Sequence, residues 1–235
     1  MAIRLYILGD FSLRIDFSME PGYDNMDNVY RIFERLQKDP GAFSWYIIPA
    51  YQSLTISYPW NQSLPEVLRI VHNAINQQTT APSPSRRFVI PVCYGGDLGP
   101  DLAFVADFHH LLPDEVIRLH SRADYRIEAI GFSPGFPYLS GLPLELITAR
   151  KETPRVRVPA GSVAIGGQQS GIYPVSSPGG WHLIGRTPLI LFDPVSTSPV
   201  PYRQGDWLHF TPISPAEYQE LLAHPPALEV WEKRA

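Results

Sequence analysis

Short runs of alternating hydrophobic and polar residues open the chain. Residues 3–8 and 12–17 have the period of β-strands, and Gly9-Asp10 between them is a typical turn pair. Residues 45–49 form another apolar run, and residues 54–58 alternate between apolar and hydroxyl-bearing side chains. Four strands are therefore predicted before residue 60.

Two helices are predicted among these strands. Apolar residues between positions 29 and 36 recur at i, i+3, i+4 and i+7, which places them on one face of a helix over residues 26–38. Residues 63–66, Ser-Leu-Pro-Glu, fit a capping box that starts a second amphipathic helix ending near Gln77. The order ββαββα predicts a small α+β sandwich with its helices on one face of a sheet.

A linker follows this sandwich. Residues 79–85 contain only threonine, serine, alanine and proline, so they offer no large apolar side chain to anchor them. We therefore predict an amino-terminal α+β domain over residues 1–85 and a second domain over residues 86–235.

The second domain is predicted to be rich in strands. Short helices are expected near residues 100–108 and 113–121, and a capped helix over residues 214–222. Apolar runs of strand length occur at residues 88–94, 125–132, 156–159, 162–165, 181–184, 189–192 and 207–210. Their number and spacing favour a β-barrel, although the strand at 88–94 fits either sheet.

Composition narrows the class of protein. The 235 residues include 25 prolines, 18% are charged and the formal net charge is −4, which disfavours a helical bundle and gives no basis for binding nucleic acid or an anionic membrane. Cys93 is the single cysteine, so an internal disulfide is excluded and a buried thiol is expected. With no signal peptide and no apolar run near the roughly 20 residues of a membrane helix, a soluble cytoplasmic protein is expected.

Glycine, proline and aromatic residues are concentrated in residues 131–139 and 166–174. Glycine allows bends that strain other residues, and large side chains can cover those bends, which is how a shaped cleft is built. An apolar cleft with a few fixed polar groups suits a small molecule or a peptide. The predicted cleft-forming residues are Gly131, Phe132, Pro134, Gly135, Phe136, Tyr138, Gly179, Gly180 and Trp181.

Two segments match the letters of catalytic motifs but lack the chemical groups that those motifs require. Residues 131–135 match the Gly-x-Ser-x-Gly pattern of a serine hydrolase, but Pro134 has no amide hydrogen for the oxyanion. Residues 166–171 have the glycine spacing of a phosphate-binding loop, but Ile172-Tyr173 replaces the lysine and the hydroxyl residue. Histidines 109, 110 and 120 are better explained as packed or solvated side chains, so no metal site is predicted.

Polar residues beside these segments can bind a ligand. Arg155 and Arg157 lie on the same side of a predicted strand, either as a solvated face or with one guanidinium group on an anion. Gln168 and Gln169 lie between glycines, where an amide side chain can pair with a lactam or carboxamide.

Ordered motifs follow one another through most of the chain, and above all after residue 91. They occupy residues 94–96, 99–102, 115–120, 131–139, 154–163, 168–174 and 177–188. Together they resemble the family of B-type 5-oxoprolinase subunits, which also includes the sporulation-kinase inhibitor KipI and the allophanate hydrolase subunit 1 domain.

The resemblance implies a fold and a setting. The second domain is expected to be a cyclophilin-like β-barrel. The chain is expected to work in a heteromeric complex with a C-type subunit, of the KipA or allophanate hydrolase subunit 2 kind, and with a third, A-type subunit. In 5-oxoprolinase such a complex couples ATP hydrolysis to opening of the lactam of 5-oxoproline to give glutamate. ATP is thus a cofactor of the complex and is not expected to bind to this chain alone.

The substrate-binding candidates are taken from these motifs and polar groups, and they are Arg157, Gln168, Tyr173, His120 and Arg186. No catalytic residue is predicted, and the isolated chain is expected to be inactive. The alternative function is KipI-type inhibition of a sensor histidine kinase, in which the same aromatic cleft grips a proline-containing segment. Prolyl isomerisation, by analogy with cyclophilin, rests on the fold alone.

Two positions depart from the family pattern. Phe108-His109-His110 stands where relatives commonly have His-Asn-Gly, so any role of that histidine is lost or displaced here. Ser170 replaces the usual threonine and keeps the hydroxyl group.

Overall fold

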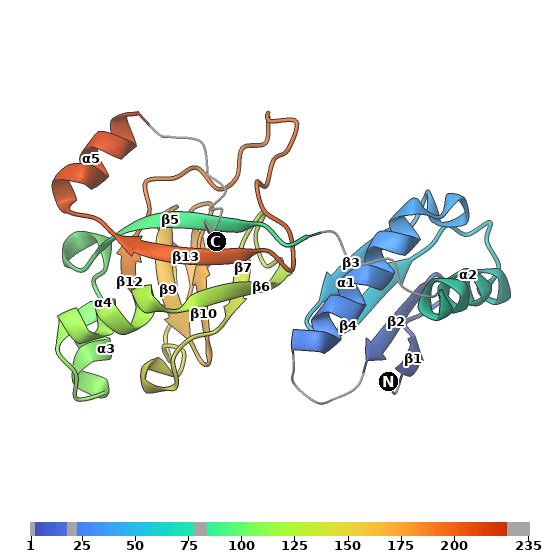
Figure 1. The fold of residues 1–235 in the computed structure, drawn as a ribbon, viewed down its shortest axis with the longest axis horizontal. Coiled ribbons are helices and arrows are strands. Elements are labelled where there is room, and N and C mark those ends of the chain that lie inside the picture. The colour runs from blue at the N-terminus through green and yellow to red at the C-terminus, as the bar shows by residue number, and fades with distance from the viewer. Residues whose placement is uncertain (1–2, 18–22, 78–83, 225–235) are drawn as a thin grey trace. The chain divides into compact units, whose positions relative to one another are not determined.

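Two compact units make up the chain, one within residues 1–84 and the other within residues 85–235 (Figure 1). The computed structural model describes residues 3–17, 23–77 and 84–224. Each unit encloses a hydrophobic core of its own. A separate core is the feature that allows a segment of chain to be stable as a domain.

The first unit has the predicted element order ββαββα. Its strands form one antiparallel sheet in the spatial order β1-β2-β4-β3. The elements are β1 (Ile3–Ile7), β2 (Ser12–Phe17), α1 (Tyr23–Lys38), β3 (Tyr46–Ala50), β4 (Ser53–Ser57) and α2 (Leu64–Asn76). The prediction of a small α+β sandwich is confirmed.

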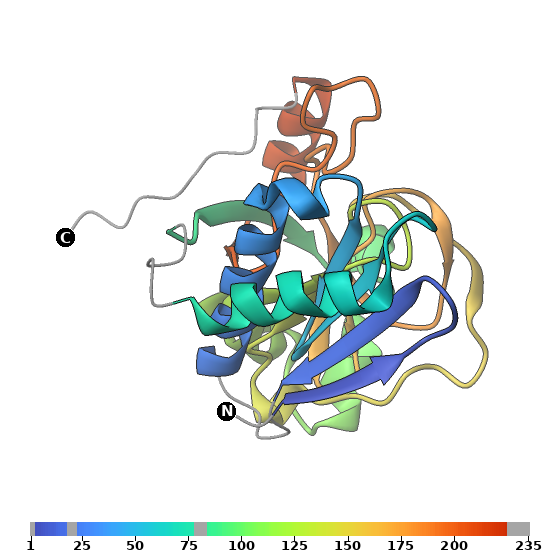
Figure 2. The same cartoon turned by 90° about the vertical axis from the view of Figure 1, so that its right-hand side faces the viewer.

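Both helices of this unit pack on one face of the sheet (Figure 2). Apolar side chains alternate along β2 and β4 because successive residues of a strand point to opposite faces. The helices contribute residues at helical spacing to the same core. Its fully buried side chains include Leu13, Ile15, Phe17, Val29, Ile32, Leu36, Leu54, Ile56, Val67 and Val71.

The helix α2 begins without the predicted capping box. Ser63 precedes the helix with an extended backbone (φ −80°, ψ 147°), but its hydroxyl group makes no capping hydrogen bond. The Val67 amide bonds to the Ser63 carbonyl oxygen at 3.1 Å, and Pro65 has no amide that needs a partner, so the backbone alone starts the helix. The corresponding box at Ser214 is confirmed, because its hydroxyl oxygen accepts a hydrogen bond from the Glu217 amide at 3.3 Å.

The second unit is built around a closed barrel, as predicted. Seven strands follow one another around it in the order β10-β7-β6-β13-β5-β12-β9. The pairs are antiparallel except for β5 and β13, which run parallel. The strands are β5 (Arg87–Tyr94), β6 (Asp124–Ile130), β7 (Pro137–Ser140), β9 (Ser162–Gly166), β10 (Gln169–Ile172), β12 (His182–Arg186) and β13 (Trp207–Pro212).

Smaller elements surround this barrel (Figure 1). The helix α3 (Leu102–Phe108) packs against α4 (Pro113–Arg122) and β12, and α5 (Pro215–Ala223) follows β13. The strands β8 (Arg155–Val158) and β11 (Ser177–Gly179) form a separate two-stranded sheet. None of the helices in the described ranges is long and apolar enough to cross a membrane.

Strand prediction failed where proline or glycine interrupts the apolar alternation. The strands β7, β10 and β11 were not predicted, and they contain Pro137, Gly171 and Pro178 respectively. Residues 189–192 were predicted to be a strand, but they follow an irregular path between two prolines. Proline has no amide hydrogen to donate to a neighbouring strand. Burial of Leu189 and Leu191 explains their apolar character without pairing.

The barrel strands separate an inner core from an outer one. On β9, Val163 and Ile165 belong to the large cluster that fills the barrel. Ala164 lies between them in the chain and belongs to a second cluster, together with Phe136 and Trp181. Because neighbouring residues of a strand point to opposite faces, this second cluster lies on the outside of the barrel wall.

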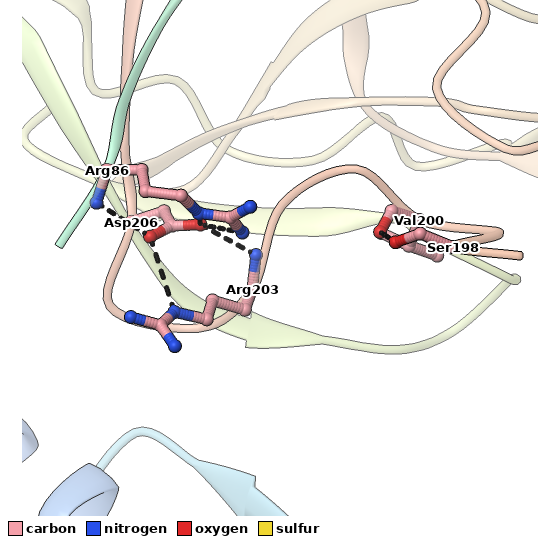
Figure 3. Close-up of polar contacts among 5 residues, drawn as sticks. All are labelled: Arg86, Ser198, Val200, Arg203 and Asp206. Carbon is pink, nitrogen blue, oxygen red and sulfur yellow. Dashed lines mark hydrogen bonds and ion pairs between the residues drawn. The ribbon is translucent and has the colours of Figure 1, made fainter. Parts of the chain in front are cut away.

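A buried carboxylate ties the start of β5 to the segment before β13 (Figure 3). Asp206 is fully buried and accepts hydrogen bonds from the backbone amides of Arg86 and Arg203, both at 2.9 Å. The Arg86 guanidinium group adds two further bonds to this carboxylate, at 3.1 and 2.6 Å. These donors offset the cost of removing the carboxylate from water.

Replacing this carboxylate is expected to destabilise the second unit. Asp206→Asn puts an amide group among donors that need an acceptor, so we expect a loss of about 2–3 kcal/mol in the free energy of unfolding. Urea denaturation followed by near-ultraviolet circular dichroism measures this loss. The matched control is Asp124→Asn, which weakens the half-exposed contacts of this carboxylate with Arg87 and His209 and should cost no more than about 1 kcal/mol. Equal losses in the two variants would contradict the role assigned to Asp206.

Candidate functional site

A cavity of about 350 Å³ lies against the outer cluster of the barrel wall. Seven of the residues predicted from the sequence line it: Phe132, Phe136, Tyr138, Tyr173, Gly179, Gly180 and Trp181. The other lining residues are Arg150, Lys151, Pro154 and Pro178. The cavity therefore combines an aromatic wall with two positively charged side chains.

The Phe136 ring is the centre of the aromatic wall. Its centroid lies 4.9 Å from that of Tyr138, 5.0 Å from that of Tyr173 and 5.4 Å from that of Trp181. The ring planes meet at 63–83°, an edge-to-face arrangement that contributes about 0.5–1.5 kcal/mol per pair beyond simple burial. The wall is thus fixed by mutual ring contacts.

Two glycines allow these rings to approach the backbone. A Cβ atom on Gly166 would lie 2.5 Å from the Trp181 indole, and one on Gly179 would lie 2.3 Å from the Tyr173 hydroxyl oxygen. No side chain fits at either place without moving a ring. Glycine is therefore required here for close approach, whereas the sequence indicated only turns.

The turn over residues 131–135 places Phe132 at the edge of the cavity. Phe132 has a left-handed backbone (φ 70°) and its side chain is 65% exposed, although it lines the cavity. The Ser133 amide bonds to the Gly131 carbonyl oxygen at 2.9 Å, and the Phe136 amide bonds to the Ser133 carbonyl oxygen at 3.1 Å. The strand β7 follows at once, so the strand–turn–helix of a nucleophile elbow is not formed.

One of the two cavity cations, Lys151, is held by a buried carboxylate that the sequence analysis missed. Asp101 accepts hydrogen bonds from Arg155 Nη2 at 2.7 Å, Lys151 Nζ at 3.4 Å and the Leu183 amide at 2.7 Å. Burial acts to raise the pKa of Asp101, but the Arg155 and Leu183 hydrogen bonds and the charges of Arg155 and Lys151 outweigh it, so the pKa is lowered. Asp101 therefore stays ionised and keeps Lys151 beside the cavity.

Tyr173 presents a phenol group to the cavity. Burial raises its pKa, and a hydrogen bond from the Trp181 amide and the charge of Arg150 oppose this rise only in part. The phenol is therefore protonated at neutral pH. In that form it can donate a hydrogen bond to a carbonyl oxygen.

His120 lies in the barrel core and not in the cavity. Its Nδ1 atom is 2.9 Å from the Tyr94 hydroxyl oxygen, and its Nε2 atom is 2.9 Å from the Ser170 hydroxyl oxygen. Ser170 donates its one hydroxyl hydrogen to the Ala164 carbonyl oxygen at 3.2 Å, so Nε2 carries the ring proton and Nδ1 accepts from Tyr94. Both ring nitrogens have partners within the fold, and His120, which was predicted to bind a ligand, is not among the residues that line the cavity.

Three other candidates do not line the cavity. Arg157 is exposed on β8 and donates to the Ser176 hydroxyl oxygen at 3.2 Å. Gln168 is exposed at the turn between β9 and β10. Arg186 lies on β12, paired with Ser162 of the neighbouring strand. Of the five predicted substrate-binding residues, the structure therefore brings only Tyr173 into the cavity.

Comparison with known proteins agrees with this fold. Residues 3–202 match the family described as carboxyltransferase domain, subdomain C and D. The B-type 5-oxoprolinase subunit of Bacillus subtilis (strain 168) is 40% identical over 232 residues, a match that covers 93% of this chain and 97% of that protein. The chain belongs to the family of B-type 5-oxoprolinase subunits.

The same fold also occurs within longer chains of solved structure. A crystal structure of TTHA0988 has a TM-score of 0.76 at 31% identity, and the match covers 91% of this chain but 40% of the TTHA0988 chain. The crystal structure of the Kluyveromyces lactis urea carboxylase has a TM-score of 0.75 at 16% identity, over 97% of this chain and 24% of that chain. At that identity the urea carboxylase match shows the fold alone.

The residues 108–110, which depart from the pattern of B-type 5-oxoprolinase subunits, are not part of the cavity lining. His109 Nε2 is 3.0 Å from the Thr148 hydroxyl oxygen, and its ring meets Phe108 edge-to-face at 4.9 Å. Within the described ranges, no group of three or more His, Cys, Asp or Glu residues is arranged to hold a metal ion. His109 is therefore a packed side chain in this family member.

The backbone of Phe132 leads to a test of strain. Phe132→Ala and Phe132→Gly both remove the ring, but only glycine adopts φ 70° without strain, so the glycine variant should be more stable by about 1 kcal/mol. Thermal or urea denaturation measures the difference. At Phe104, inside α3, the same pair of variants should show the reverse order by about 1 kcal/mol. Alanine and glycine of equal stability at position 132 would contradict a strained turn.

The buried histidine leads to a test of pH dependence. Burial lowers the pKa of His120 from its ordinary value of 6.5 to about 3. The unfolded state therefore binds one more proton between these values, so the stability is fully present above pH 6.5 and falls with acidification, by at most about 1.4 kcal/mol per pH unit.

We expect His120→Gln to flatten the slope of unfolding free energy against pH between pH 6 and 4. Urea denaturation at a series of pH values measures that slope. Val116→Ala serves as the control, because it removes buried apolar volume from the same core without removing a titratable group, and it should leave the slope unchanged. An unchanged slope in His120→Gln would show that His120 is not the group that titrates.

Proposed function

We propose that the chain is the ligand-holding subunit of an ATP-dependent 5-oxoprolinase, acting with a C-type partner and a third, A-type subunit. Membership of the family of B-type 5-oxoprolinase subunits supports this proposal. The observation that carries it is the cavity of about 350 Å³, whose size is at the small end for ligand pockets and whose wall is aromatic. Such a site suits the five-membered lactam ring of 5-oxoproline.

The lining of the cavity supports a division of labour between subunits. None of its residues is an aspartate, glutamate, histidine, serine or cysteine. These are the side chains that usually act as general base or nucleophile in the hydrolysis of an amide. The chain therefore binds and orients the ring, and a partner supplies the reacting groups.

The ATP site is also assigned to another subunit. Residues 166–171, which have the glycine spacing of a phosphate-binding loop, comprise the end of β9, a tight turn at residues 167–168 and the start of β10. A phosphate-binding loop leads instead into a helix whose amides face the phosphates. The longer TTHA0988 chain, of which this fold is 40%, supports an arrangement with additional polypeptide beside it. We propose a cytoplasmic location for the complex, because ATP is available there.

The cavity can contribute to the reaction by positioning. ATP supplies activation by phosphorylating the lactam oxygen, which makes the ring carbon electrophilic. The Tyr173 phenol is a hydrogen-bond donor within the cavity, where a donor aimed at developing negative charge has its largest effect. The rings of Phe136 and Trp181 exclude water from the bound lactam.

The test is reconstitution of the complex. The chain is purified with its C-type and A-type partners, and release of glutamate and ADP is measured with 5-oxoproline. Activity is expected only in the complex, and Trp181→Ala should lower kcat/KM about thirtyfold, the effect of losing an aromatic anchor worth about 2 kcal/mol. Trp60→Ala is the matched control, because Trp60 is 81% exposed and lies in the first unit.

Two results would contradict the proposal. The first is ATP-dependent hydrolysis of 5-oxoproline by the isolated chain. The second is a reconstituted complex that consumes ATP with urea or allophanate but not with 5-oxoproline.

A further inference from the structure

The charges on the cavity wall are all of one sign. Arg150 and Lys151 are the ionisable lining residues that are charged at neutral pH, and both are cations. An aromatic wall by itself suits a positively charged ammonium group, which is attracted to the faces of the rings. Two adjacent cations remove that preference, and they favour a ligand that carries negative charge.

Both cations are held in place by the residues that form the wall. The Arg150 guanidinium carbon lies 5.6 Å from the centroid of the Trp181 ring. The Lys151 amide bonds to the Gly180 carbonyl oxygen at 2.8 Å, which fixes the backbone at the cavity. Positive charge is therefore built into the same part of the wall as the indole.

This positive charge is incompletely neutralised. Asp101 is shared between Arg155 at 2.7 Å and Lys151 at 3.4 Å, so one carboxylate faces two cations. Arg150 is exposed, and no carboxylate within the described ranges forms an ion pair with it. Glu152 is exposed and is not part of the lining. A ligand carboxylate would supply the missing counter-charge.

The effect of this charge reaches the hydroxyl group of Tyr173. Arg150 and Arg155 both act to lower the pKa of that phenol, although burial raises it overall. The electrostatic potential at the cavity wall therefore favours a bound anion. This agrees with the position of the two guanidinium groups near the cavity.

We propose that the cavity selects a compact ring bearing one carboxylate, with the ring against Trp181 and Phe136 and the carboxylate toward Arg150 and Lys151. This inference deepens the proposed function and rests on it, because 5-oxoproline is a five-membered ring with a carboxylate. It assigns to Arg150 and Lys151 the discrimination between an acid and a neutral amide or urea. Neither residue was a candidate from the sequence.

The experiment compares acids with their uncharged amides. Binding of 5-oxo-L-proline and 5-oxo-L-prolinamide to the full chain is measured by isothermal titration calorimetry, alongside cyclopentanecarboxylate and cyclopentanecarboxamide. The second pair keeps the ring and the charge difference but has no lactam. We expect each acid to bind about tenfold more tightly than its amide, the range of one charge-assisted hydrogen bond.

Variants identify the source of this preference. Arg150→Gln and Lys151→Gln should each weaken binding of the acids about threefold, so that together they account for the preference, and leave binding of the amides unchanged. Arg150→Lys should restore most of the affinity because it keeps the charge. Arg157→Gln is the matched control, since Arg157 is an exposed arginine that does not line the cavity. Circular dichroism verifies that each variant is folded.

The outcomes separate this inference from the proposed function. The inference is overturned if the amides bind as tightly as the acids, if the wild-type chain binds none of the four compounds, or if acids and amides weaken equally in the variants. An acid preference that depends on Arg150 and Lys151 supports it, even if the reconstituted complex does not hydrolyse 5-oxoproline. That last result would count against the proposed function alone.

Discussion

Closure of the barrel by the parallel pair of β5 and β13 is the constraint on which the second unit depends. Residues 87–92 pair in register with residues 207–212, so the two ends of the barrel sequence lie side by side. A parallel pair requires a long connection between its strands. Here that connection contains all the remaining strands of the barrel. The buried Asp206 holds the entry to both strands together.

The cavity exists because both faces of the closed barrel wall carry packed side chains. Its inner face is filled by aliphatic and aromatic side chains, and by His120, whose ring nitrogens both find partners. Its outer face carries Phe136, Tyr173 and Trp181, which meet at close range over glycines. The Asp101 cluster then adds charge at the edge of the outer face. Packing thus supplies the shape of the site, and one buried carboxylate orients part of its charge.

Much of the fold could be predicted from the sequence, because periodicity reports directly on burial. The alternation along residues 12–17 and 54–58 matches β2 and β4, whose apolar residues are buried. The strand β10 could not be found in this way, because Gly171 has no side chain to signal that a ring of Phe136 covers it. Apolar residues at 189 and 191 are buried in an irregular segment, which periodicity cannot distinguish from a strand.

The aromatic residues of the candidate site were predicted from the sequence, but its charged residues were not. Clustered glycines and aromatics indicated the cleft, and Tyr173 lies in it. Arg157 and Gln168 were chosen from motifs, but strand direction and a tight turn send both to the surface. The position of Lys151 depends on Asp101, 50 residues earlier in the chain, and no local pattern reports such a contact.

The division of β9 between the two faces has an evolutionary consequence. Val163 and Ile165 pack in the barrel core, whereas Ala164 packs in the outer cluster, so substitutions at adjacent positions act on different clusters. Drift in the outward positions can retune which metabolite is accepted while the inward positions keep the protein folded. A lineage can therefore diverge in chemistry one substitution at a time, without passing through an unfolded ancestor.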